Sequence, residues 1–149
     1  MSNQSKKKPI LQLLISSKGK KNFNFLDEMF HKCDADQFSI LLVDQTKREI
    51  NFKPLHKKYS FVYYNIPSNG LSNSRNFAIN KSDAEICLIC DDDVVFEKNF
   101  VDIIIKAFQT ETSADIITFR ANNTLNKLFK KYPNKTIHDY KTIAFINSF

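Results

Sequence analysis

Three consecutive carboxylates, Asp91, Asp92 and Asp93, directly follow an apolar segment of strand length. Like charges this close repel one another unless a cation neutralises them. Along an extended segment alternate side chains point the same way, so Asp91 and Asp93 would share a side. Two carboxylates on one side suit Mg²⁺ or Mn²⁺, which takes the rest of its ligand shell from water and a substrate diphosphate. The alternative is that these aspartates cap the helix that follows them.

Asp44, Gly70 and Arg75 are further residues that follow strand-like segments. Asp44 could cap a turn, or it could accept hydrogen bonds from a nucleobase or ribose. Gly70 could permit a left-handed turn whose exposed backbone N–H groups meet phosphate. Arg75 could donate in a fork to diphosphate oxygens or a base edge, or it could form a surface ion pair.

Alternating strands and helices would position these residues. Short, continuously apolar strands between amphipathic helices indicate an α/β fold with a mostly parallel sheet covered on both faces. The expected strands span residues 10–16, 38–43, 60–64, 85–90, 115–119 and 142–146, with a short extra strand at 48–52. The expected helices cover residues 26–33, 73–81 and 98–110. Ligands of such sheets bind outside the carboxyl ends of the strands, so all the residues named above would gather at one edge.

The composition is that of one globular domain over residues 1–149. The formal net charge of +6 favours anionic partners, although short lysine clusters also serve as solvated surface. Three cysteines form no disulfide framework, which suits a reducing cytoplasm. Since no apolar run is long enough to span a bilayer, we expect a cytoplasmic protein, with peripheral association at the inner membrane face as a further option.

The order of these features resembles that of family 2 glycosyltransferases with a GT-A fold. That family has a first strand, a second strand ending in Asp, an N-x-G-x-x-x-x-R-N stretch and a strand ending in D-x-D. This chain carries LLISS, LLVDQT, NGLSNSRNFAI and ICLICDDDVVF in the same order and with compatible spacing. The resemblance covers about residues 11–119 and is nearest to bacterial capsular or exopolysaccharide glycosyltransferases.

The resemblance implies a transferase that binds a nucleoside-diphosphate sugar, commonly a UDP-sugar, through Mn²⁺ or Mg²⁺. The sugar, a hexosyl group, would pass with inversion to a saccharide or lipid-linked acceptor. By this likeness Asp44 would recognise the nucleobase, Ser17 would line the nucleotide pocket, and Arg75 would sit beside the nucleotide.

For the acidic triplet, the resemblance implies that Asp91 lies near the ribose and sugar and that Asp93 ligates the metal. Asp92 could share either role, because the triplet allows two frames of the D-x-D pattern. Asp91 and Asp93 would then be the metal ligands, with Asp91 and Asp92 also facing the sugar nucleotide.

Two departures from the family pattern matter. The turn after the first strand often carries an aromatic ring against the base, whereas this chain has Ser16, Ser17, Lys18 and Gly19 there. Inverting members also place a catalytic carboxylate well downstream of D-x-D, as the general base for the acceptor hydroxyl. We therefore expect that base beyond Phe149, and a C-terminally truncated GT-A domain without its acceptor-binding part.

Two other functions compete with this interpretation. The chain could be a donor-binding fragment without transferase activity, or a nucleotidyltransferase-like enzyme that also uses paired aspartates and metal. The second class would want a glycine-rich phosphate loop near the N-terminus, which Gly19 and its lysines match poorly. Nucleic-acid binding is not expected, because the net charge is the only feature of the sequence that favours it.

Overall fold

The computed structural model describes residues 10–46, 58–66 and 70–122. The chain divides into two compact units, Met1–Thr112 and Ser113–Phe149. All helices and strands named below lie in the first unit. The single domain predicted for residues 1–149 stays a prediction, since two compact units can belong to one domain.

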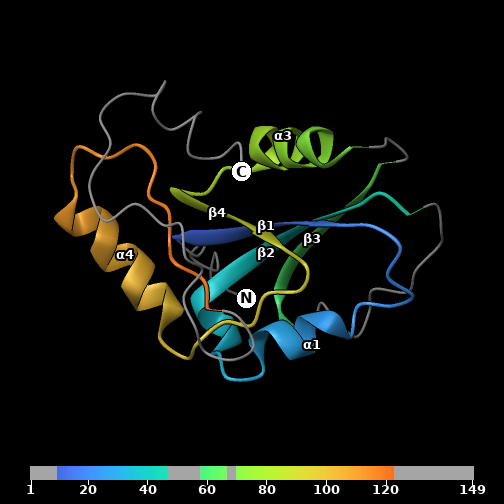
Figure 1. Ribbon diagram of the computed structural model, residues 1–149, viewed down its shortest axis with the longest axis horizontal. Helices are drawn as coiled ribbons and strands as arrows, with labels where there is room; N and C mark the ends of the chain where they lie inside the picture. The colour runs from blue at the N-terminus through green and yellow to red at the C-terminus, as the bar shows by residue number, and fades with distance from the viewer. Residues whose placement is uncertain (1–9, 47–57, 67–69, 123–149) are drawn as a thin grey trace, which may run out of the picture. The chain divides into compact units, whose positions relative to one another are not determined.

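A four-stranded parallel sheet forms the centre of the first unit, in the order β3-β2-β1-β4 (Figure 1). The strands are β1 (Leu11–Ser17), β2 (Phe38–Asp44), β3 (Ser60–Asn65) and β4 (Ile86–Asp91). β1 and β2 are buried along their whole length because they are the inner strands and both faces of the sheet are covered there. This burial explains why their sequences are continuously apolar rather than alternating. The predicted α/β class with a parallel sheet is confirmed.

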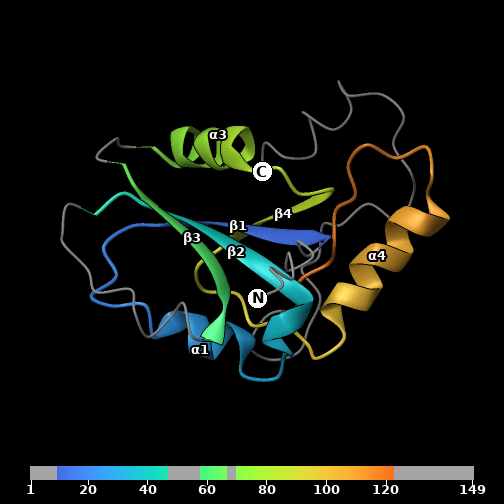
Figure 2. The same ribbon diagram turned by 180° about the vertical axis from the view of Figure 1, so that it is seen from behind.

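Helices cover both faces of the sheet. α3 (Leu71–Lys81) lies on one face and α1 (Phe25–Phe30) on the other, as Figures 1 and 2 show from opposite sides. Ala78 of α3 packs into a core cluster with Leu14, Leu41 and Val43. A small side chain at this point lets the helix approach the sheet closely.

An aromatic cluster fills the α1 face and accounts for part of the phenylalanine content. The ring centroids of Phe30 and Phe38 are 4.8 Å apart, and Phe96 stacks on Phe30 at 5.3 Å. Phe100, the first residue of α4 (Phe100–Thr110), lies 4.5 Å from Phe96 and 5.4 Å from Phe38. The cluster therefore joins α1, β2 and α4 and includes the segment that follows the acidic triplet. A short 3₁₀ helix, η1 (Ala35–Gln37), leads from α1 into β2.

Four expected strands and all three expected helices are present, with ends that differ by a few residues. The strand expected at 115–119 is wrong, because the backbone there is irregular and Ile116 is 84% exposed. An apolar run becomes a strand only when a neighbouring strand pairs its backbone N–H and C=O groups. The strands expected at 48–52 and 142–146 lie outside the described residues. Within the described ranges, no helix combines the length and apolar character needed to cross a bilayer.

Candidate functional site

A cavity of about 440 Å³ opens where the carboxyl ends of the strands meet the start of α3. Its lining comes from the end of β1, the residue after β2, the N-terminus of α3 and the acidic triplet: Ser16, Ser17, Lys18, Gln45, Gly70, Leu71, Asp91, Asp92 and Asp93. This is the edge at which ligands of parallel α/β sheets bind. The structure therefore brings Ser17 and the whole triplet together, as predicted.

The register of the sheet decides which side chains share a face. Ser16 of β1 is opposite Asp91 of β4, and Ser17 is opposite Asp44 of β2. Since side chains alternate along a strand, Ser16 and Asp91 point to the α3 face while Ser17 and Asp44 point to the α1 face. Arg75 of α3 reaches the first of these pairs.

Ser16 and Ser17 both line the cavity and are buried, with exposures of 7% and 3%. Within the described part of the chain, neither Oγ has a hydrogen-bond partner. A buried polar group without a partner costs free energy, and native proteins rarely leave one unsatisfied. Both residues line the cavity, so their hydroxyls are candidate donors to a polar ligand there.

Asp44 is fully buried at the end of β2. Its Oδ1 accepts a hydrogen bond from the Thr46 backbone N–H at 2.8 Å, and its Oδ2 accepts one from the Tyr63 hydroxyl at 3.3 Å. Through the first of these bonds Asp44 caps the turn after β2, which is one of the two roles that the sequence suggested for it. The cavity is lined by its neighbour Gln45 and not by Asp44 itself. Recognition of a nucleobase by Asp44 stays a prediction.

Gly70 sits at the N-cap of α3 with φ of 120°, a backbone conformation that L side chains rarely adopt. Its carbonyl oxygen accepts a hydrogen bond from Gln45 Nε2 at 3.0 Å, which ties the start of the helix to the end of β2. Gly70 itself has no side chain that could cap the helix. Because the first N–H groups of an α-helix lack partners inside the helix and carry partial positive charge, Gly70 and Leu71 give the cavity an anion-attracting wall.

Arg75 and Asp91 form an ion pair, with Arg75 Nη2 2.6 Å from Asp91 Oδ1. Arg75 Nε is buried and, among the described residues, has no hydrogen-bond partner. The pair joins the first turns of α3 to the last residue of β4. Both side chains are partly exposed, so the pair itself adds at most about 1 kcal/mol to stability.

Asp92 also has a cation beside it, since Lys20 Nζ lies 3.3 Å from its Oδ1. Asp93 is exposed and makes no ion pair with any residue that the structure describes. The helix-capping alternative for the triplet is wrong, because α4 begins only at Phe100, after the N-cap residue Asn99.

The triplet fits a divalent cation that draws most of its ligands from a substrate. Across the described ranges, no three His, Cys, Asp or Glu side chains converge into a complete metal cage. Mg²⁺ and Mn²⁺ need no such cage, because one or two carboxylates with diphosphate oxygens and water complete their shell. Three cavity-lining carboxylates beside unpaired serine hydroxyls match that donor set.

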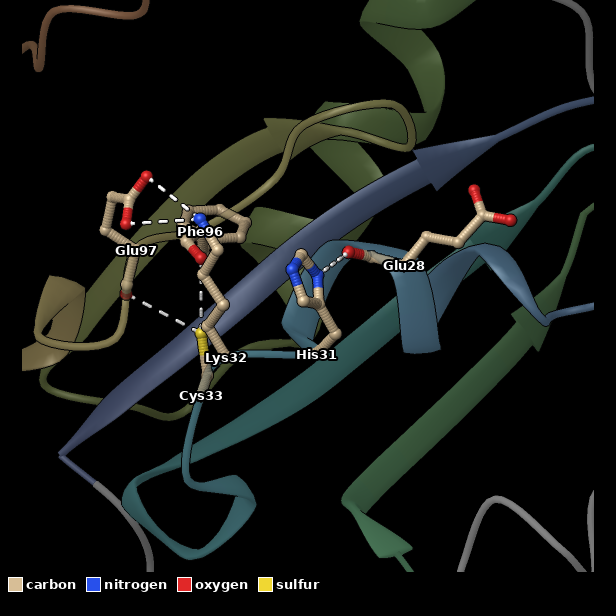
Figure 3. A network of polar contacts seen from close by, with 6 residues as sticks. All are labelled: Glu28, His31, Lys32, Cys33, Phe96 and Glu97. Carbon is tan, nitrogen blue, oxygen red and sulfur yellow. Dashed lines mark hydrogen bonds and ion pairs between the residues drawn. The ribbon is translucent and has the colours of Figure 1, made fainter.

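The segment after the triplet is fastened to the C-terminal end of α1 (Figure 3). The backbone N–H of Phe96 donates to the Met29 carbonyl at 2.9 Å. The Cys33 thiol donates to the carbonyls of Phe96 and Glu97, each at 3.6 Å, and Lys32 Nζ lies 3.4 Å from Glu97 Oε1. Burial, and secondarily the Glu97 charge, raises the pKa of Cys33, so the thiol keeps the proton that it donates.

Cys87 and Cys90 do not form a redox pair. They occupy positions of opposite parity on β4, so their side chains point to opposite faces of the sheet. Burial, and then the Asp91 charge, raises the pKa of the Cys90 thiol, which is the reverse of what a reactive thiolate needs.

Three site residues were missed from the sequence. Gln45 and Lys18 both line the cavity. The only indication of this in the sequence is that Gln45 directly follows Asp44 and Lys18 directly follows Ser17. Lys20 belongs to a lysine cluster that reads as solvated surface, and nothing local indicates its contact with Asp92. Gly19 has a positive φ of 77°, a backbone conformation that glycine adopts more readily than other residues.

Comparison with protein families matches residues 20–147 to Glycosyl transferase family 2. The comparison with curated proteins finds no match. The family match covers most of the chain and includes Asp44, Arg75 and the triplet, and it sets the nucleotidyltransferase alternative aside. Together with a parallel sheet whose carboxyl edge carries an acidic cavity, it leads to one conclusion: the chain belongs to glycosyl transferase family 2.

Proposed function

We propose that the cavity binds the diphosphate of a UDP-sugar through a divalent cation, and that the hexosyl group passes with inversion to a saccharide or lipid-linked acceptor. One observation carries the proposal: Ser16 and Ser17, whose hydroxyls have no partner among the described residues, the N-terminus of α3 and three carboxylates line the same cavity. Hydroxyls and helix N–H groups are donors for anionic oxygens, whereas carboxylates repel those oxygens. A ligand that satisfies both sides carries phosphate and brings a cation.

Each part of the cavity would have a distinct role. Ser17 and the first N–H groups of α3 would donate to diphosphate oxygens, and Arg75 would contribute its unpaired Nε and fork to the nucleotide. Asp93, which has no ion pair among the described residues, would be the first carboxylate ligand of Mn²⁺ or Mg²⁺. Asp91 would be the second. The bound cation would offset the negative charge that develops on the leaving diphosphate.

The nucleoside would lie toward the end of β2. Asp44 would serve base recognition from there, and its neighbour Gln45 already faces the cavity. Asp92 would lie beside the sugar. The product would be a surface polysaccharide, made from cytoplasmic sugar nucleotides at the inner face of a bacterial membrane, for which the sequence resemblance and the net charge of +6 are the support.

Calorimetry of UDP with and without Mn²⁺ tests the proposal. Wild-type protein should bind UDP more tightly in the presence of Mn²⁺ than in its absence. Asp93→Asn should weaken UDP binding in the presence of Mn²⁺ at least roughly tenfold, as expected for losing a contact to a charged group. The matched control is Asp102→Asn, an exposed aspartate on α4 that does not line the cavity. Equal UDP binding with and without Mn²⁺, or equal binding by wild type and an Asp91→Ala, Asp93→Ala double variant, would overturn the proposal.

A further inference from the structure

Lys20, in the loop after β1, forms an ion pair with Asp92 of the acidic triplet. Its ammonium lies 3.3 Å from Asp92 Oδ1 and 5.5 Å from the centroid of the Phe25 ring. The lysine side chain is 36% exposed and Asp92 is 18% exposed. The ammonium therefore has a carboxylate and an aromatic face as partners while still in contact with solvent.

The loop that carries Lys20 is fixed by two neighbours. Gly19 adopts φ of 77°, and its N–H donates to Thr46 Oγ1 at 2.6 Å, which ties this loop to the end of β2. Phe25, at the start of α1, is buried. The backbone before Lys20 and the ring under its ammonium are thus both held in place, so the contact with Asp92 is built into the fold.

Protein cations occupy two carboxylates of the triplet in this structure. Arg75 pairs with Asp91, and Lys20 pairs with Asp92. A divalent cation at the triplet would compete with these side chains for the same carboxylate oxygens, because two positive charges held close to one carboxylate repel each other. Partly exposed ion pairs are weak, so such an exchange is readily reversible.

We propose that Lys20 is a positioning residue that changes partner when the sugar nucleotide binds. Before binding, its ammonium neutralises Asp92. When the cation reaches the triplet, the ammonium moves from Asp92 to the diphosphate that arrives with that cation. This inference rests on the proposed function, since it takes UDP and a divalent cation as the ligands of the cavity.

Loss of Lys20 should change the affinities for the two ligands in opposite directions. In Lys20→Gln, Mn²⁺ alone should bind roughly two- to fivefold more tightly, because a competing cation is gone. UDP at saturating Mn²⁺ should bind roughly fivefold more weakly, because the charged donor that would meet the diphosphate is gone. A lysine that only stabilised the loop would lower both affinities when removed, so the opposite signs separate the two roles.

The test is calorimetry, with the full chain, of Mn²⁺ alone and of UDP at saturating Mn²⁺. Lys20→Arg keeps the charge and should behave like wild type toward Mn²⁺. Lys21→Gln removes the same charge from the neighbouring exposed residue and should leave both affinities within twofold, which corrects for the change in net charge. Urea unfolding of each variant checks that the fold is kept.

The outcomes separate the two proposals. If wild type binds both ligands but Lys20→Gln changes both affinities in the same direction, or changes neither, the partner exchange is wrong while the UDP site stands. If Lys21→Gln shows the same opposite changes, the effect is one of net charge, and the exchange is also wrong. If wild type does not bind UDP in the presence of Mn²⁺, the proposed function fails and the exchange fails with it.

Discussion

Ser17 and Ser39 are buried serines on neighbouring inner strands, and they differ in their hydrogen bonding. The Ser39 hydroxyl accepts a hydrogen bond from Gln12 Nε2 at 3.1 Å. The Ser17 hydroxyl has no partner among the described residues, and Ser17 lines the cavity. Removing an unsatisfied hydroxyl relieves a desolvation cost, whereas removing a satisfied one leaves its partner unpaired. At the scale of the single residue, we infer from this difference that the Ser17 hydroxyl serves ligand binding and the Ser39 hydroxyl serves stability.

The substitutions Ser17→Ala and Ser39→Ala should therefore have opposite consequences. Ser17→Ala should leave the free energy of unfolding unchanged or raise it by up to about 1 kcal/mol, and weaken UDP binding roughly fivefold. Ser39→Ala should lower the free energy of unfolding by about 1 kcal/mol and leave UDP affinity unchanged. Urea unfolding and UDP calorimetry measure both quantities. Loss of stability without loss of UDP affinity in Ser17→Ala would contradict the assigned role.

At the scale of elements, α1 determines where the triplet can lie. The triplet follows β4, an outer strand of the described sheet, so the strand fixes the triplet from one end only. The other end is fixed by Phe96, whose backbone N–H donates to the Met29 carbonyl and whose ring stacks on the Phe30 ring. A ligand site held at both ends keeps its geometry better than one on a loose loop.

Phe96→Ala should therefore weaken both stability and donor binding. Truncating this partly buried ring should lower the free energy of unfolding by about 2 kcal/mol, which is less than a fully buried phenylalanine would cost. The affinity for UDP with Mn²⁺ should fall measurably under conditions where the variant is fully folded. Val95→Ala, at the exposed neighbouring position, should change stability by no more than about 0.5 kcal/mol. An unchanged affinity in folded Phe96→Ala would show that the triplet does not depend on this attachment.

At the scale of the whole molecule, a net charge of +6 attracts every polyanion, while the cavity selects one chemistry. Binding to a built site stabilises the folded state in proportion to the logarithm of ligand concentration over Kd. Attraction by net charge acts on the unfolded chain as well, and salt screens it. The two kinds of binding therefore differ in their effect on thermal unfolding.

UDP with Mn²⁺ at about one hundred times Kd should raise the free energy of unfolding by about 2.7 kcal/mol, or the midpoint by roughly 5–10 °C. EDTA should remove most of this gain, because the carboxylates then repel the diphosphate. A short oligonucleotide at 0.15 M salt should give little stabilisation. Differential scanning calorimetry provides the measurement. Equal stabilisation by UDP in the presence of EDTA would mean that the triplet does not hold a cation for the nucleotide.

Much of the site could be predicted because strand ends in a parallel sheet must converge. The apolar runs of β1, β2 and β4 located Ser17 and the triplet at one edge without any knowledge of contacts. Contacts between segments far apart in sequence could not be predicted in this way. The Lys20–Asp92 pair depends on the path of a loop that Gly19 turns, and no local pattern encodes it.

The sequence by itself determined the α/β class, the parallel sheet, the glycine-dependent turns at Gly19 and Gly70, and the edge where the acidic triplet lies. These follow from local periodicity and backbone sterics, which each segment carries within itself. Only the tertiary structure decided that Asp44 is buried, that Arg75 and Lys20 neutralise part of the triplet, and that residues 115–119 form no strand. Those outcomes depend on which groups from distant segments meet, because hydrogen bonds, ion pairs and strand pairing each need a partner that the local sequence does not specify.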